Sequence, residues 1–321
     1  MTTAQQLNTQ FGIDGHLVFS EDAPVKGTPP DTRPAGGLGA ASGLIVAEIR
    51  NPQATATLCL QGAHLMTWQP SSQSVPGIWL SRDARLAAGK SIRGGVPVCW
   101  PWFGAHTSEP GFPAHGYART APWQVVESGV EPNGATRLTL RLIECEKTRA
   151  QWPYSCRLEL TVIVGEALRM ELSTENTGES DFVISEALHA YFQIGDISAV
   201  RVTGLTGCDY WDKVGTSTLK KQDGAIQFTG ETDRVYINTA AECVIEDDKL
   251  KRRILVAKSG SLSTVVWTPW TAKADRMGDL GQPDGWREML CVESANAIDN
   301  AVHVAAGTRH TLIVEYRGEL L

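Results

Sequence analysis

Three short segments of this sequence contain residues that could bind an anion or move a proton. The first, residues 79–123, concentrates arginine and lysine in a chain whose formal net charge is -7. Arg93 precedes two glycines, whose missing side chains would let a ligand approach the backbone, and Arg119 ends the run HGYAR. Guanidinium groups bind phosphate oxygens in a bidentate manner. The segment is therefore a candidate anion site, although ion pairs with carboxylates such as Asp83 and Glu127 explain its arginines equally well.

The second segment, SEALHAYF (185–192), contributes a histidine. Side chains alternate along a strand, which would place His189 and Tyr191 on the face opposite Leu188 and Phe192. A histidine with a pKa near the ordinary value of about 6.5 can donate or accept a proton near neutral pH. Single histidines on strands are more often structural, so the residue type alone leaves both interpretations open.

The third segment, GWREMLCVESAN (285–296), ends in a strand-like run in which Met289, Cys291 and Glu293 would share one face. Glu293 would then project beside apolar neighbours. Such a carboxylate is either a catalytic base or the partner of a buried arginine, and spacing alone does not decide between them.

Several common chemistries lack their sequence signatures here. The chain contains no HExxH motif, no paired-cysteine zinc pattern, no GxxxxGK[ST] loop and no GxSxG elbow. We therefore expect no metal and no cofactor. The seven cysteines are odd in number, never form CxxC and lie mostly in apolar runs, which predicts reduced thiols and a cytoplasmic location.

Charge and hydropathy limit the partners. A formal net charge of -7 over 321 residues disfavours general nucleic-acid binding, while a local basic pocket could still hold a small anion. The start of the chain lacks a basic region followed by an apolar one, and no uncharged apolar stretch approaches the roughly 18 residues of a spanning helix. We expect neither a signal peptide nor a membrane segment.

Alternation of apolar and polar residues dominates the rest of the chain and predicts strands with one wet face. Turn signals such as Asn133-Gly134 separate them, and only residues 270–278 suggest a helix. The expected architecture is all-β, a large antiparallel β-sandwich. The predicted strands are 54–60, 137–143, 157–164, 168–174, 253–257, 262–267 and 311–316.

Three segments interrupt this pattern. Residues 21–40 are rich in proline, glycine and charge, and we interpret them as a surface loop. The expected organisation is an N-terminal segment and loop, 1–41, followed by a single domain, 42–321. Segments 79–122 and 265–296 alternate too little for ordinary strands, and long irregular segments of this kind are often functional loops.

Six motifs, in this order, carry a resemblance to a known family: IRGGVPVCWPWFG (92–104), HGYAR (115–119), SEALHAYFQIGD (185–196), TDRVY (232–236), VVWTPW (265–270) and MLCVESAN (289–296). Together they resemble the glucose-6-phosphate 1-epimerases, the D-hexose-6-phosphate mutarotases of the galactose-mutarotase-like superfamily. The match covers roughly residues 42–318. It implies the β-sandwich of that superfamily, no cofactor, and a sugar pocket on the concave face of one sheet.

The resemblance also implies roles for individual residues. His189 matches the catalytic histidine of the family and Glu293 its catalytic glutamate. We expect Glu293 to be ionised and to act as the base, and we expect a nearby carboxylate to keep His189 protonated as the acid. The positions that match substrate-binding residues are Arg93, Arg119, His115 and Asp233.

The sequence departs from the family pattern at Ala114, where glutamine is common, and at Thr268 and Ser294. The loss of an amide at Ala114 bears on sugar preference rather than on the chemistry.

The expected activity is interconversion of the α and β anomers of glucose 6-phosphate and related hexose 6-phosphates, by a monomer. Two alternatives stay open. One is an aldose 1-epimerase acting on unphosphorylated sugars, against which the basic cluster speaks. The other is a sugar-phosphate binding protein without catalysis, for which paired acid and base residues would have no use.

Overall fold

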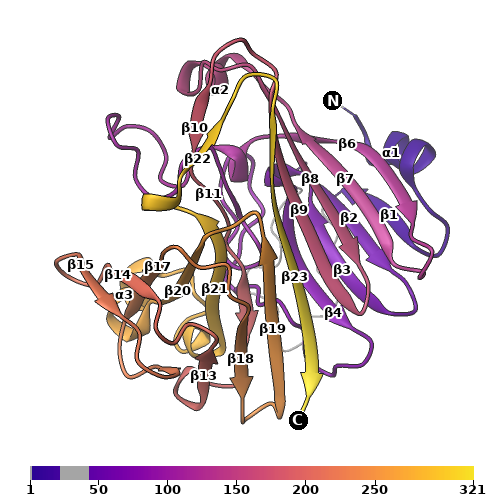
Figure 1. Cartoon of the computed structure of the whole chain (residues 1–321). Coiled ribbons are helices and arrows are strands. Elements are labelled where there is room, and N and C mark those ends of the chain that lie inside the picture. Colours follow the sequence, from indigo (N-terminus) through magenta and orange to yellow (C-terminus); the bar gives the residue numbers. More distant parts are fainter. Residues whose placement is uncertain (1, 22–42) are drawn as a thin grey trace.

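The computed structural model describes residues 2–21 and 43–321 and shows an all-β architecture of large antiparallel sheets, which confirms the predicted fold class. The interpretation of residues 21–40 as a loop falls almost entirely outside the described residues. One layer is a nine-stranded sheet that runs across the molecule (Figure 1). In spatial order its strands are β16 (Ile226–Gln227), β13 (Val200–Thr203), β18 (Cys243–Asp247), β19 (Arg252–Ser259), β23 (Arg309–Leu320), β9 (Ala167–Asn176), β8 (Cys156–Val164), β7 (Thr136–Leu142) and β6 (Trp123–Val130).

Two further sheets form the opposing layer. The four-stranded sheet contains β1 (Leu17–Glu21), β2 (Ile45–Arg50), β3 (Ala54–Cys59) and β4 (His64–Pro70). The eight-stranded sheet contains β15 (Thr218–Lys221), β14 (Asp209–Asp212), β17 (Thr232–Tyr236), β20 (Ser263–Thr268), β21 (Met289–Asn296), β11 (Glu186–Leu188) and β5 (Val98–Cys99), with β12 (Tyr191–Gln193) also paired to β21. A bridge between Leu65 and Val96 links these two sheets.

The remaining elements are short. β10 (Phe182–Ile184) pairs with β22 (Val302–Val304), and the α-helices are α1 (Ala4–Phe11), α2 (Glu146–Gln151) and α3 (Trp270–Met277). Short 3-10 turns lie at Gln61–Ala63, Ala118–Thr120, Ile197–Ala199, Gly285–Glu288 and Ile298–Asn300. No described helix is long and apolar enough to cross a membrane.

Strands form where apolar and polar residues alternate in the sequence. In β9 every second residue is buried, so Leu168, Met170 and Leu172 face the core while Arg169 and Glu171 face solvent. All seven strands expected from alternation are present, as is the helix expected near residues 270–278.

Two expectations about local structure need correction. Residues 265–296 are not wholly irregular, because they include most of β20, which overlaps the strand expected at 262–267, and all of β21, whose eight residues are all buried. The helix α1 was not expected either. It is short and buries a single residue, Leu7, with Ala4 and Phe11 partly buried beside it, and it begins with a capping box formed by Thr3 and Gln6.

Contacts across the sandwich hold the layers together. The rings of Phe192 in β12 and Tyr316 in β23 meet edge to face at 5.0 Å. Trp100 is fully buried, and its Nε1 donates to Thr174 Oγ1 at 3.1 Å. The buried guanidinium of Arg252 in β19 donates to the carbonyls of the opposing layer, including that of Gln193.

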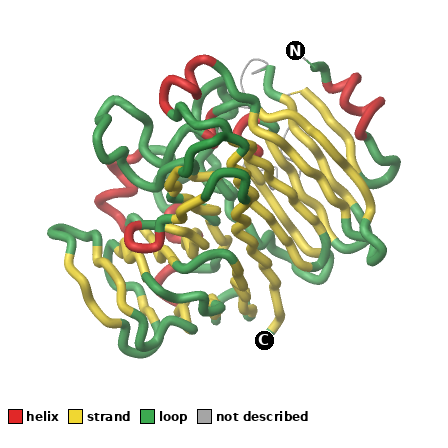
Figure 2. Tube along the Cα trace, turned by 45° about the horizontal axis from the view of Figure 1, so that its top comes forward, coloured by secondary structure: helices red, strands yellow, loops and turns green. Residues whose placement is uncertain are grey.

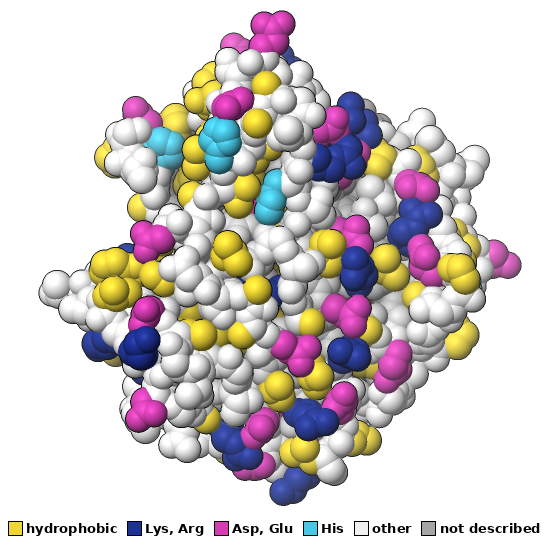
Figure 3. Space-filling model, in the orientation of Figure 1, with side chains coloured by type: hydrophobic (Ala, Val, Ile, Leu, Met, Phe, Trp, Pro, Cys, Tyr) yellow, Lys and Arg dark blue, Asp and Glu magenta, His cyan; other side chains and the backbone are white. Residues whose placement is uncertain are grey.

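The outer face of the nine-stranded sheet is polar. Positive and negative side chains are interspersed over this side of the molecule (Figure 3), and they include the pairs Arg169–Glu171 at 2.7 Å and Arg317–Glu315 at 3.4 Å. Exposed pairs of this kind contribute about 0–1 kcal/mol each. They keep the face soluble rather than holding the fold together.

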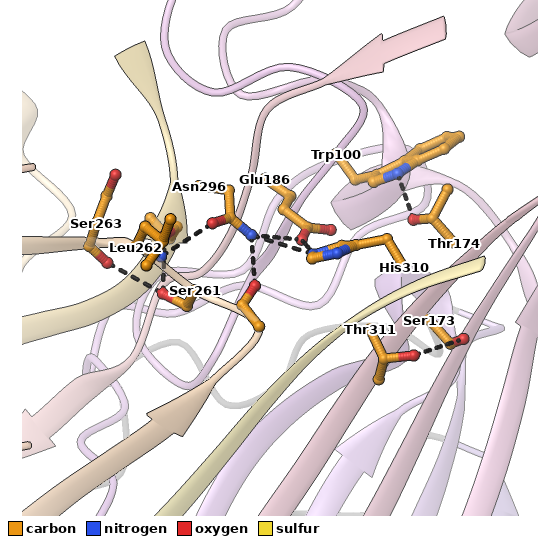
Figure 4. Close-up of polar contacts among 12 residues, drawn as sticks. Trp100, Ser173, Thr174, Glu186, Ser261, Leu262, Ser263, Asn296, His310 and Thr311 are labelled. Carbon is orange, nitrogen blue, oxygen red and sulfur yellow. Dashed lines mark hydrogen bonds and ion pairs between the residues drawn. The ribbon is translucent and has the colours of Figure 1, made fainter. Parts of the chain in front are cut away.

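A buried polar network lies between the layers, on the face of the β11–β21 ladder that is turned toward β23. Glu186 is fully buried, and its Oε1 lies 2.9 Å from Nε2 of His310 and accepts from Asn296 Nδ2 at 3.0 Å (Figure 4). Asn296 also donates to the carbonyl of Gly260. Burial lowers the pKa of His310, but the hydrogen bond to Glu186 and its negative charge outweigh burial and raise that pKa above 6.5. The network ties β11, β21 and β23 together.

We predict that His310→Leu lowers the free energy of unfolding by about 3 kcal/mol at pH 6, because the substitution leaves Glu186 buried without its cationic partner. A histidine with a raised folded-state pKa contributes its full stabilisation below about pH 6.5 and loses it as the pH rises through the folded-state value. The difference between the two proteins in urea unfolding should therefore be smaller at pH 9.

The matched control is His303→Leu, which removes an exposed histidine that pairs with Asp181. This change should cost at most about 1 kcal/mol. Equal losses in both variants would show that the buried network has no special role in stability.

Candidate active site

A break in the eight-stranded sheet creates the candidate site. β11 pairs with β21 as far as Leu188 opposite Ser294, and β12 resumes the pairing with Tyr191 opposite Cys291. His189 falls in the break, and its backbone N–H donates to the carbonyl of Pro97 at 3.0 Å instead of joining the ladder. The register is the same on both sides of the break, so His189 lies opposite Glu293 of β21, as Ala190 lies opposite Val292.

His189 and Glu293 are in direct contact. Nε2 of the imidazole lies 3.3 Å from Oε1 of the carboxyl group, with side-chain exposures of 12% and 2%. Among the described residues, the other polar atom of each side chain, Nδ1 of His189 and Oε2 of Glu293, is buried without a hydrogen-bond partner. Unsatisfied buried polar atoms cost about 1–3 kcal/mol each, so native proteins retain them mainly where a ligand or a reaction uses them.

The protonation of this pair differs from the expectation. Burial lowers the pKa of His189 well below 6.5, and His115, Arg119 and Arg93 lower it further. Burial also raises the pKa of Glu293 well above 4.5; Asp233 acts in the same direction and Arg119 opposes it. Both shifts disfavour the charged forms, toward a neutral imidazole at His189 and a protonated carboxyl group at Glu293 in the substrate-free protein. The expectation of a protonated His189 beside an ionised Glu293 is wrong for this state, because desolvation penalises both charges.

Arg93 sits at the rim of the same site. Its Nε donates to Asp279 Oδ1 at 3.0 Å, and its Nη1 donates to the hydroxyl of Tyr191 at 3.0 Å. The backbone that carries it depends on two glycines. Gly94 has a φ of +97°, and a Cβ there would lie 2.7 Å from the Cα of Leu80, so a side chain has no room. The carboxylate that pairs with Arg93 is thus Asp279, far away in sequence, rather than one of the nearby carboxylates considered above.

Arg119 and His115 approach from the neighbouring loop. Arg119 is half-buried, and its Nη2 donates to the carbonyl of Ala114 at 2.8 Å. The His115 ring lies 5.9 Å from the ring of His189. Burial and the charges of Arg119 and Arg93 lower the pKa of His115 to about 4, so this side chain is neutral at pH 7.

Asp233 completes the set from the opposite side. In β17 it lies opposite Trp267 of β20, whose ring is 6.2 Å from that of His189. Burial raises the pKa of Asp233, while Lys273, whose Nζ is 3.9 Å from Oδ2, opposes that change. Contacts and electrostatic effects thus place all six residues selected from the sequence near one another: His189, Glu293, Arg93, Arg119, His115 and Asp233.

Aromatic side chains pack beside His189, and they were not among the residues selected from the sequence for the site. The ring of Tyr191 lies parallel to that of His189, with 4.9 Å between centroids and 13° between planes, and Trp79 stacks on Tyr191 at 5.9 Å. Alternation placed Tyr191 on the face of His189 and so could have identified it. No local pattern pointed to Asp279 or Lys273, because they reach the site from α3 and the loop after it.

The site thus combines strands and irregular chain. Glu293 comes from β21 and His189 from the break between β11 and β12, and the long loop that contains residues 79–122 supplies Arg93 and Arg119; in Figure 2 many of the loops gather on the side of the molecule away from the long strands. Within residues 2–21 and 43–321, no three His, Cys, Asp or Glu side chains are grouped so that they could hold a metal ion. The arrangement suits proton transfer to and from a small, polar, anionic ligand.

Comparison with known proteins agrees with this fold. The profile of the aldose 1-epimerase family matches residues 46–317. The chain therefore belongs to that family, and it is an isomerase that acts on sugars.

Individual relatives show which members of the family this chain resembles. A protein of Escherichia coli K12 named "Putative glucose-6-phosphate 1-epimerase" is 40% identical over 250 residues, which cover 78% of this chain and 82% of the relative. A protein of the same name from Cenchrus ciliaris is 32% identical, with coverage of 83% and 80%. The crystal structure of "a putative mutarotase (YeaD)" from Salmonella typhimurium matches with a TM-score of 0.81 at 35% identity, covering 87% of this chain and 91% of that one.

We predict that the imidazole of His189 in the substrate-free protein is still uncharged at pH 6.5, where an unperturbed histidine is half protonated. Burial disfavours the imidazolium, and the arginines nearby add to that effect. Nitrogen-15 NMR of the histidine side chains, with His189 assigned by comparison with His189→Asn, measures the midpoint directly. A midpoint at or above pH 6.5 would contradict the assignment of an uncharged pair.

Proposed function

We propose that this enzyme is a mutarotase of hexose 6-phosphates, which interconverts the α and β anomers of glucose 6-phosphate and related sugars. The observation that carries the proposal is the buried contact between His189 and Glu293, in which each side chain keeps one polar atom free for a ligand. Two arginines at the same site, in an acidic chain, provide a place for the phosphate. The names of the relatives support the same substrate.

The proposed mechanism opens the sugar ring with one acid and one base. Glu293 accepts the proton of the anomeric hydroxyl while His189 donates a proton to the ring oxygen, so the C1–O5 bond breaks and C1 becomes an aldehyde. The pair then carries its single proton on Glu293, and His189 is neutral. Rotation about C1–C2 and the reverse transfers close the ring on the other face and regenerate the first state.

The protonation favoured in the substrate-free protein is the one that this mechanism reaches after ring opening. Before the first step, one proton must pass from Glu293 to His189. The contact of 3.3 Å makes that transfer short, and the number of protons on the pair does not change. The pair therefore needs no exchange with solvent during a catalytic cycle.

Arg93 and Arg119 are proposed to bind the phosphate, and His115 and Asp233 to contact the sugar. His115 is neutral and can donate or accept a hydrogen bond, and the half-buried carboxyl group of Asp233 can bind sugar hydroxyls. The aromatic rings of Trp79 and Trp267 are suited to the C–H faces of a pyranose.

An aldose 1-epimerase for unphosphorylated sugars is the alternative, and one observation favours it. Asp279 already forms an ion pair with Arg93, which offsets part of the positive charge at the rim. The two candidates differ in whether the arginines act on a phosphate, and the arginine variants below distinguish them.

Glu293→Gln and His189→Asn should each reduce the turnover of glucose 6-phosphate at least about a hundredfold, since a positioned acid or base typically contributes 10²–10⁴ in rate. Saturation-transfer NMR of the exchange between anomers is the measurement. Glu319→Gln and His303→Asn are the matched controls on the exposed surface and should keep normal rates. Near-normal exchange in either site variant would remove the role given to that residue.

Arg93→Ala and Arg119→Ala should each raise the Michaelis constant for glucose 6-phosphate at least about tenfold, because a charge-assisted hydrogen bond contributes about 1.5–3 kcal/mol. The constant for free glucose should change much less. Arg169→Ala, on the outer face of β9, serves as the control. Equal effects on both sugars would favour the alternative without a phosphate.

A further inference from the structure

Tyr191 joins the rim of the site to its centre. Its hydroxyl accepts a hydrogen bond from Nη1 of Arg93 at 3.0 Å, and its ring lies parallel to the imidazole of His189 at 4.9 Å. The side chain is buried, so both contacts are shielded from water. A single residue thus contacts the cation assigned to phosphate binding and the histidine assigned to proton transfer.

The backbone reinforces this connection. The N–H of Tyr191 donates to the carbonyl of Gly95 at 2.9 Å, and the N–H of His189 donates to that of Pro97 at 3.0 Å. The segment that follows Arg93 therefore runs beside the segment that carries His189. Because Gly94 and Gly95 have no room for a side chain, this part of the loop has little freedom to move independently.

The contact between the rings of Tyr191 and His189 makes His189 sensitive to the charge at Arg93. While the hydroxyl accepts from a positively charged guanidinium, electron density is drawn from the ring, which makes the ring a weaker partner for a cation. A dianion at Arg93 reverses this effect, since the hydroxyl can then donate to an anionic oxygen. The ring then better stabilises an imidazolium at His189. Among the described residues, Nη2 of Arg93 has no protein partner and is open to such an anion.

Arg93 differs from the other cation near the pair, Arg119, because it lowers the pKa of His189 and not that of Glu293. Arg119 lowers the pKa of both His189 and Glu293, so neutralising it changes their relative proton affinity little. Arg93 and His115 lower the pKa of His189. The nearby charged group that raises the pKa of Glu293 is Asp233. Neutralising Arg93 therefore favours passage of the shared proton to His189.

We propose that Tyr191 is a positioning residue through which a dianion held at Arg93 activates the catalytic pair, even when that dianion is not attached to the sugar. The proposal rests on the proposed function and adds a regulation of the same site. The phosphate of the substrate would then both anchor the sugar and place the proton on the acid that opens the ring. Free glucose, which lacks this group, would meet a pair in its less reactive protonation state.

The test uses free glucose together with phosphite, a dianion of the same class as the missing phosphate group. Exchange between glucose anomers is measured at pH 8 with increasing phosphite, and a blank without enzyme is subtracted because oxyanions catalyse mutarotation themselves. In the unmodified enzyme, kcat/KM for glucose should rise at least about fivefold and saturate, as expected for coupling between two sites. No activation, with normal turnover of glucose 6-phosphate, would overturn the proposal and leave the proposed function standing. Absence of turnover with either sugar would instead defeat the proposed function.

Tyr191→Phe tests the connection from Arg93 to His189 separately from the binding of phosphate. It keeps the stacked ring but removes the hydroxyl, so most of the activation by phosphite should be lost, and kcat for glucose 6-phosphate should fall more than KM rises. Tyr236→Phe is the matched control, because the hydroxyl of this buried tyrosine in the same sheet donates to Gln222 instead. Full activation in Tyr191→Phe would overturn the role of Tyr191.

A second measurement does not depend on turnover. Phosphite should raise the NMR titration midpoint of His189 in the unmodified protein, and should raise it less in Tyr191→Phe. An unchanged midpoint in the unmodified protein, with phosphite bound, would also overturn the proposal.

Discussion

Burial of β21 on both of its faces is the constraint on which the rest of the structure depends. All eight residues of this strand are buried, and they include Glu293 on one face and Asn296 near the network of Glu186 and His310 on the other. A carboxyl group fixed in such a strand cannot turn away to reach water. Its environment, rather than its intrinsic acidity, then decides where its proton resides.

The same desolvation acts on the imidazole beside it, and it explains why the pair holds one proton in an uncharged form. Two buried charges of opposite sign attract each other, but each would lose its hydration, and here the loss dominates. The site therefore has two protonation states with equal net charge and different reactivity. The proposed effect of a dianion at Arg93 acts on the balance between them.

Much of the fold could be predicted from the sequence because the exposed sheet leaves a clear alternation, as in β9 with Arg169 outside and Met170 inside. β21 gives a weaker signal since both of its faces are covered, and the short α1 buries one residue only. The site residues could be selected from the sequence because they lie in recognisable motifs.

The protonation of His189 could not be predicted in the same way. Its pKa depends on burial and on cations from other segments, neither of which is local in sequence. Asp279 escaped notice for the same reason: its partner Arg93 lies 186 positions away along the chain.

The site, at the break between β11 and β12, combines two parts that can change independently in evolution. In the proposed mechanism, proton transfer depends on a buried sheet, whereas recognition of the group attached to the sugar depends on a loop that borders that sheet. A descendant could acquire a different substrate by remodelling the loop while its acid–base machinery stayed untouched. The arrangement thus lets one scaffold serve sugars that differ only in what is attached far from the reacting carbon.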